Sequence, residues 1–130
     1  MTKQEIFDKV AAHFAVQLAP AIDEEGNCQY RAEDGHKCAV GALIPDDAYD
    51  PKCESSVVEF LFERWPDMMQ AAGLCREDCG FLERIQFSHD HARQDANFLA
   101  DLPVYMAKVA VRYALDPSCL TALTAQREPQ

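Results

Sequence analysis

Two cysteines and one histidine are the residues of this sequence that could together carry out covalent chemistry. Cys28 and Cys38 flank a short run of turn-forming residues, and His89 lies on a helical pattern whose apolar positions face the core. A cysteine attacks as a thiolate and needs a base beside it, which an inward-facing histidine can supply. The arrangement allows a cysteine-dependent hydrolase or transferase in which His89 activates Cys38 or Cys28.

The competing interpretation treats these residues as structural. Buried free cysteines are common and behave as small apolar residues, and an inward-facing histidine can be satisfied by a backbone carbonyl. Asp90 directly follows His89, so on a helix its side chain points about 100° away and is a poor partner for orienting the imidazole. We therefore favour a non-enzymatic protein over an enzyme that uses Cys38 and His89.

Nitrogen and sulfur donors also occur at spacings that suggest a zinc site. Cys75 and Cys79 precede His89 and His91, and these are the ligand types that zinc prefers. The two histidines would lie on different sides of a helix, however, so the four donors would not converge. We expect no bound metal and no cofactor from this set. The same expectation holds for a second set of donors, Cys28, His36 and Cys38.

The pair His89-Asp90 is also found in helical metal phosphohydrolases of the His-Asp type. Those sites need an upstream histidine and a distant aspartate on other helices, and His13 and His36 are poorly placed for this. The sequence has no phosphate-binding glycine loop, no serine elbow and no basic aromatic stripe. These observations argue against nucleotide hydrolysis, serine hydrolysis and single-strand binding.

A recognition surface is the non-catalytic use of the polar residues around the turn. Arg31, Lys37 and Tyr49 lie near two acidic loops at 23–25 and 46–50, and loops held by a scaffold often carry binding. An ordinary solvated rim is the simpler interpretation of any one of them. The full set of candidate binding residues is Tyr30, Arg31, Lys37, Tyr49 and Asp90.

The charge balance favours one class of partner. The chain has 22 acidic and 12 basic residues and a net charge of −10. Residues 1–65 carry 13 of the acids and 6 of the bases, so the surplus is greater in the N-terminal half. Such a field repels phosphate backbones and anionic lipid, so we expect a protein partner with basic character, no direct binding of nucleic acid and no membrane binding.

The first residues predict the cellular setting. Residues 1–9 lack the basic start and apolar run of a signal peptide, and no stretch of the chain reaches eighteen apolar residues. We expect a cytoplasmic protein whose six cysteines remain thiols.

The elements that position these residues follow from periodicity and turn signals. A capping box at Thr2 and Glu5 opens a predicted helix over 2–19, and helical patterns cover 55 to 125, with a tail at 126–130 that should fray. Between them, 28–44 is predicted to form a β-hairpin. We expect one domain over 1–130, an α+β fold that is predominantly helical, with five or six helices packed on the hairpin.

The turn of the hairpin decides which side chains share a face. A two-residue turn would place Cys28 opposite Ala39 and put Cys38 on the other face. A three-residue turn over 33–35, with Gly35 at positive φ, places Tyr30 opposite Cys38 and Cys28 opposite Val40. We prefer the second register because it gives one apolar face, which we expect to pack against the helices.

One segment resembles a known family. The pattern of Cys28, Tyr30, Arg31, Gly35 and Cys38-Ala39-Val40-Gly41, followed by Leu43-Ile44 and much later by Gln86 and His89-Asp90, is similar to a family of small uncharacterised proteins of bacteriophages and prophages. The resemblance implies an accessory phage product and assigns no catalytic residue. We therefore expect a phage or prophage accessory protein that binds another protein and so modulates a host process, in the host cytoplasm.

Overall fold

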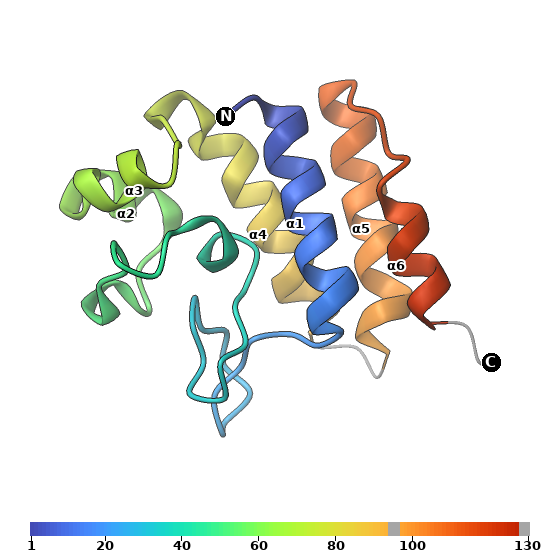
Figure 1. Ribbon diagram of the computed structural model, residues 1–130, viewed down its shortest axis with the longest axis horizontal. Helices are drawn as coiled ribbons and strands as arrows, with labels where there is room; N and C mark the ends of the chain where they lie inside the picture. Colours follow the sequence, from blue (N-terminus) through green and yellow to red (C-terminus); the bar gives the residue numbers. More distant parts are fainter. Residues whose placement is uncertain (94–96, 128–130) are drawn as a thin grey trace.

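The computed structural model describes residues 1–93 and 97–127, and in this part of the chain every regular element is a helix (Figure 1). The α-helices are α1 (Lys3–Gln17), α2 (Val58–Arg64), α3 (Pro66–Ala71), α4 (Cys79–Ala92), α5 (Phe98–Tyr113) and α6 (Leu120–Arg127). Three short 3-10 helices lie between them, η1 (Gly41–Leu43), η2 (Pro51–Cys53) and η3 (Arg76–Asp78). Of the tail predicted to fray, 126 and 127 belong to α6, and 128–130 lie outside the described residues.

The first helix forms as its sequence predicts. The Thr2 side chain accepts the backbone N–H of Glu5, and the Glu5 carboxylate accepts the backbone N–H of Thr2. This capping box satisfies two donors that a helix start leaves unpaired. The apolar side of α1 is buried and consists of Ile6, Phe7, Val10, Ala11 and Phe14.

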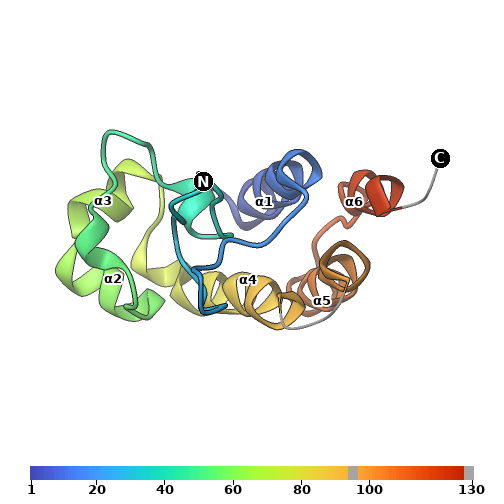
Figure 2. The ribbon, with the colours of Figure 1, turned by 90° about the horizontal axis from the view of Figure 1, so that it is seen from below.

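The longer helices pack in two layers (Figure 2). α2, α4 and α5 lie along one side of the molecule, and α1 and α6 lie along the other. α5 contacts both α4 and α6, and α6 also contacts α1. The core between the layers includes Phe7, Phe14, Leu82, Ile85 and Met106, each at most 1% exposed.

The prediction of an α+β fold with a β-hairpin over 28–44 is wrong. In the described residues the only β-type pairings are two isolated bridges, Ile22 with Cys28 and Arg31 with Lys37. In the second bridge Arg31 lies opposite Lys37, which is the pairing that a three-residue turn over 33–35 gives, and Gly35 has φ +92°. The ladder stops there because the chain turns into η1, so Cys28 lies opposite Ile22 and not opposite Val40.

Side chains replace the missing ladder. The Glu54 carboxylate accepts the backbone N–H groups of Tyr30 and Arg31 at 2.8 and 3.0 Å. Gln17 of α1 binds both the N–H and the C=O of Lys37, at 2.7 and 2.9 Å. Because each buried backbone group needs a partner of some kind, these side chains hold an irregular segment that would otherwise need a second strand.

At Gly41 the backbone of η1 lies directly against the backbone of Tyr30. A Cβ atom at this position would lie 1.9 Å from the carbonyl oxygen of Tyr30. Glycine is therefore required for steric reasons, and the start of η1 packs directly on the chain at Tyr30.

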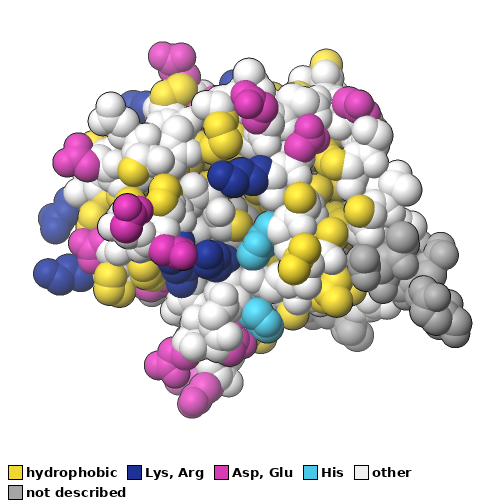
Figure 3. Space-filling view, in the orientation of Figure 1, with side chains coloured by type: hydrophobic (Ala, Val, Ile, Leu, Met, Phe, Trp, Pro, Cys, Tyr) yellow, Lys and Arg dark blue, Asp and Glu magenta, His cyan; other side chains and the backbone are white. Residues whose placement is uncertain are grey.

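The segment between α1 and α2, residues 18–57, is mostly irregular, and we call it the coil segment. Acidic side chains gather at its end that projects below the rest of the molecule in Figure 3. They come from the loops of the N-terminal half, where the sequence has its larger acid surplus: Asp23, Glu24, Glu25, Glu33 and Asp34. Among the helices described here, none combines the length and the hydropathy needed to cross a bilayer.

Candidate functional site

His89 lies at the centre of a hydrogen-bonded cluster on α4. It is 0% exposed, and its ring packs near Phe14 and Phe98, with centroid distances of 5.6 and 5.8 Å. Its Nε2 atom lies 3.0 Å from the backbone N of Ala21, and its Nδ1 atom lies 3.0 Å from Oδ1 of Asp90. The inward position of His89 predicted from the sequence is confirmed.

The two contacts of His89 determine its tautomer. The backbone N–H of Ala21 can only donate, so Nε2 must accept and the ring proton lies on Nδ1. The Nδ1–H group donates a hydrogen bond to the carboxylate of Asp90, although the sequence predicts that this side chain points away from the imidazole. The expectation was wrong because two further donors hold the Asp90 carboxylate beside His89: its Oδ1 atom also accepts from Cys28 Sγ at 2.8 Å and from Gln86 Nε2, one turn earlier on α4, at 3.0 Å.

The predicted pair of Cys38 and His89 is not assembled. Cys38 is 0% exposed and its Sγ atom accepts the backbone N–H of Gly41 at 3.3 Å, while both His89 nitrogens are engaged elsewhere. Burial raises the pKa of the Cys38 thiol far above its ordinary value. Cys38 is thus a packed thiol.

Cys28 is closer to the cluster but is not activated either. Burial, together with the hydrogen bond to Asp90 and the charge of Asp90, raises the pKa of the Cys28 thiol to about 12. A nucleophilic cysteine needs the opposite shift. The geometry therefore gives no support to a cysteine-dependent hydrolase or transferase.

The ligand atoms of Cys28, His89 and Asp90 lie within 4.8 Å of one another, close enough to hold a metal ion. This trio was not among the sets considered from the sequence. A metal on Nδ1 would force the ring proton onto Nε2, which faces the N–H of Ala21 at 3.0 Å. Metal-bound histidines donate their second nitrogen to an acceptor, and here that position holds a donor. These residues therefore do not fit a metal.

The sets of metal donors considered from the sequence do not converge. Cys75 Sγ donates to Asp78 at 3.1 Å, and Cys79 Sγ donates to Glu83 at 3.2 Å. Among the described residues, the trio of Cys28, His89 and Asp90 is the only cluster whose ligand atoms approach this closely.

Four of the predicted binding residues hold the coil segment together. Arg31 pairs with Asp46 at 2.7 Å and lies over the ring of Tyr49 at 4.7 Å. Lys37 pairs with the same carboxylate at 3.1 Å. The hydroxyl groups of Tyr49 and Tyr30 donate to Glu54 and to the backbone of Ser56. Of the five predicted binding residues, Tyr30 and Asp90 also line a cavity.

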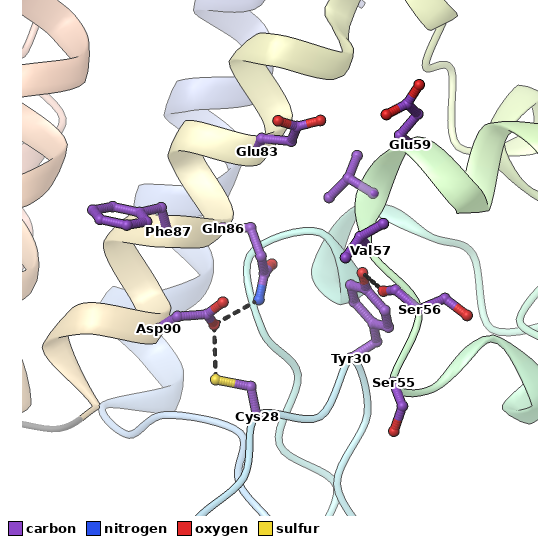
Figure 4. Close-up of a pocket in the computed structure, with 11 residues that line it drawn as sticks. Cys28, Tyr30, Ser55, Ser56, Val57, Glu59, Glu83, Gln86, Phe87 and Asp90 are labelled. Atoms are coloured by element: carbon purple, nitrogen blue, oxygen red, sulfur yellow. Dashed lines mark hydrogen bonds between the residues drawn. The ribbon is translucent and has the colours of Figure 1, made fainter.

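That cavity is an open pocket of about 530 Å³ between the start of α2 and α4 (Figure 4). We call it the acidic pocket. Three carboxylates line it, Glu59 from α2 and Glu83 and Asp90 from α4, and no Lys or Arg among the described residues does so. Its apolar lining consists of Tyr30, Val57, Val58 and Phe87.

The carboxylates of the acidic pocket are available to a cation. Burial opposes the ionisation of Asp90, but hydrogen bonds from His89, Cys28 and Gln86 outweigh it and hold the pKa of Asp90 below its ordinary value. Glu59 and Glu83 are exposed, and neither forms an ion pair with a described residue. The pocket therefore carries a concentrated negative charge.

Sequence reasoning missed three of the residues that shape this pocket, Glu59, Glu83 and Phe87. Phe87 offered a signal, because it is a large apolar residue off the core stripe that contains Ile85 and His89. It is 54% exposed in the structure. A single exposed aromatic residue is common on protein surfaces, so Phe87 becomes informative only beside Val57, which is 70% exposed and lines the same pocket.

Comparisons of this chain with protein-family models, curated proteins and solved structures found no match.

Proposed function

We propose that this protein acts by binding a positively charged, partly apolar segment of another protein in the acidic pocket, without catalysis. The observation that carries the proposal is the combination of three carboxylates with an apolar lining in one pocket of about 530 Å³. A lysine or arginine side chain matches this chemistry, because its apolar stem can pack on aromatic residues while its charged end meets a carboxylate.

The three carboxylates should contribute unequally. Asp90 is half-buried and held in place by three donors, so it loses little side-chain entropy on binding a cation. Glu59 and Glu83 are exposed, and each exposed ion pair contributes roughly 0.2–1 kcal/mol. We expect Asp90 to anchor the cation and the two glutamates to select for positive charge and to speed encounter.

The apolar walls supply a second source of affinity. Val57 is 70% exposed and Phe87 is 54% exposed, so both have area left to bury. Full burial of such a side chain is worth about 1.5–3 kcal/mol, and covering the exposed half of Phe87 contributes roughly half of that. A segment that alternates basic and apolar residues uses both properties of the pocket.

The resemblance to small phage and prophage proteins adds a setting to this proposal. In that setting the partner is a phage or host protein, and occupation of the acidic pocket modulates a host process.

Binding of a labelled peptide tests the proposal. The probe is a peptide of alternating arginine and leucine, followed by fluorescence anisotropy, with a glutamate-leucine peptide as its counterpart. We expect the arginine peptide to bind more tightly, to weaken with salt, and to weaken at least about fivefold in the double variant Glu59→Gln, Glu83→Gln. Glu24→Gln with Glu25→Gln removes the same charge from the loop at 23–25, whose residues do not line the acidic pocket. Equal binding of both peptides, or equal losses in the two double variants, would overturn the proposal.

A further inference from the structure

A second groove lies on the other side of α4. It has a volume of about 520 Å³, runs between α4 and α5, and contains Arg84 from α4 with Lys108 and Arg112 from α5. We call it the basic groove. None of its three cations forms an ion pair with a described residue, although Lys108 lies over the ring of Tyr105 at 5.6 Å.

This chain gathers three cations that pair with no described carboxylate in one groove. It has 22 acidic residues for 12 basic ones, so acidic partners are abundant. Lys3, Arg31, Lys37 and Arg76 each pair with a carboxylate. Four other cations form no ion pair with a described residue, but they are not gathered in this groove: Lys9, Lys52, Arg64 and Arg93. The basic groove therefore presents three positive charges that no carboxylate in the described part of the chain pairs with.

The acidic pocket and the basic groove share one ridge. Glu83 and Phe87 line both cavities, and the ring of Phe87 lies 3.8 Å from that of His91, which in turn lies 5.7 Å from that of Tyr105. The helices that form both cavities, α2, α4 and α5, lie along the same side of the molecule (Figure 2). This side thus presents a negative pocket, an aromatic ridge and a positive groove in sequence.

We infer that a second copy of this chain docks on this side, so that the acidic pocket of each copy faces the basic groove of the other. A two-fold axis that runs along α4 over Phe87 exchanges the two flanks of the ridge. It therefore brings opposite charges together twice and stacks the two aromatic ridges at the centre. An isologous contact of this kind closes after two copies.

Such a contact requires only a small part of the molecular surface. A standard interface covers roughly 800 Å² of each partner, which is about a tenth of the 7171 Å² surface of this chain. An apolar centre with a charged rim is the usual composition of such surfaces, and the exposed ring of Phe87 provides that centre.

This inference rests on the proposed function, because it assigns a second occupant to the same acidic pocket. Self-association and partner binding are then mutually exclusive. A basic partner would convert dimers into one-to-one complexes, and a high concentration of the protein would hold the pocket closed.

A charge exchange between two variants tests the dimer. One variant carries Glu59→Lys and Glu83→Lys, and the other carries Lys108→Glu and Arg112→Glu. Each alone places like charges together in both halves of the contact, so we expect dimerisation to weaken at least about 100-fold. Mixed in equal amounts, the two variants restore opposite charges in both halves. We expect the mixture to form a heterodimer of two chains in sedimentation and light-scattering experiments.

Each outcome has a definite meaning. Dimeric wild-type protein, monomeric variants and a dimeric mixture support the inference. A monomeric wild type at high concentration and low salt overturns it, and so does a mixture that stays monomeric. Glu24→Lys with Glu25→Lys is the control of equal charge change and should dimerise like the wild type. The variant Lys108→Glu, Arg112→Glu keeps the acidic pocket intact, so its binding of the arginine peptide judges the proposed function separately.

Discussion

The imidazole Nε2 atom of His89 accepts the backbone N–H of Ala21 at 3.0 Å, and this contact decides the role of the histidine. It fixes the ring proton on Nδ1, which donates a hydrogen bond to the carboxylate of Asp90. A base for Cys38 and a ligand for a metal both need a free ring nitrogen, and His89 has none. The residue that attracts a catalytic interpretation in the sequence joins α4 to the coil segment.

Replacement of His89 should therefore cost stability. In His89→Ala the N–H of Ala21 loses its buried partner and a cavity opens beside Phe14 and Phe98, so we expect the free energy of unfolding to fall by about 3 kcal/mol. Urea denaturation measures this change. His91→Ala, on the same helix but only partly buried, should cost less than about 1 kcal/mol. Similar losses in the two variants would contradict the structural role of His89.

Thiol labelling tests the state of Cys28. Because burial and Asp90 raise its pKa to about 12, Cys28 should react with iodoacetamide at pH 8 at least about 100-fold more slowly than a free thiol. Asp90→Asn removes the negative charge beside the thiol, so Cys28 should then react faster. Peptide mapping by mass spectrometry separates Cys28 from the other cysteines. Fast labelling of Cys28 in the wild type would restore the possibility of thiol chemistry.

The carboxylate of Asp90 should make stability depend on pH. Its folded-state pKa lies below the ordinary value of 3.8, so the stabilisation is present above that value and is lost as pH falls through the lower folded pKa. Urea denaturation between pH 7 and pH 3 should show this loss in the acid range. Asp90→Asn should flatten that part of the profile. An unchanged acid limb in the variant would show that other carboxylates, such as Asp78, account for it.

Two glycines offer opposite outcomes for the same substitution. In Gly41→Ala the new Cβ would lie 1.9 Å from the Tyr30 carbonyl oxygen, so the coil segment must shift, and we expect a loss of at least about 3 kcal/mol. Gly80 lies in α4 with nothing within 4 Å of a Cβ atom. Gly80→Ala should stabilise the protein by up to about 1 kcal/mol through helix propensity. Thermal unfolding of both variants checks the pair, and equal effects would contradict the packing at Gly41.

Features decided by neighbours in the sequence were predictable. The capping box of Thr2 and Glu5 and the inward position of His89 depend on residues within one or two turns of a helix. The turn at Gly35 is equally local. Such contacts form with little loop-closure entropy, and their patterns are visible in a single sequence.

The failed predictions depended on distant partners. The backbone at Val40 looked like a strand, but its N–H is taken by Gln86, which lies 46 residues away. Glu54 and Gln17 take the other backbone groups that a strand would have paired. The acidic pocket requires α2 to pack beside α4, and no local pattern in either helix indicates that contact.

Inversion of the charge preference is the most direct test of the central claim that the acidic pocket binds a cation. The variant Glu59→Arg, Glu83→Arg keeps the apolar walls and reverses the charge of the rim. In anisotropy titrations at low salt we expect this variant to bind the arginine-leucine peptide more weakly than the wild type and the glutamate-leucine peptide more strongly. If the variant retains the wild-type preference for arginine, the cation binds elsewhere and the acidic pocket is not its site.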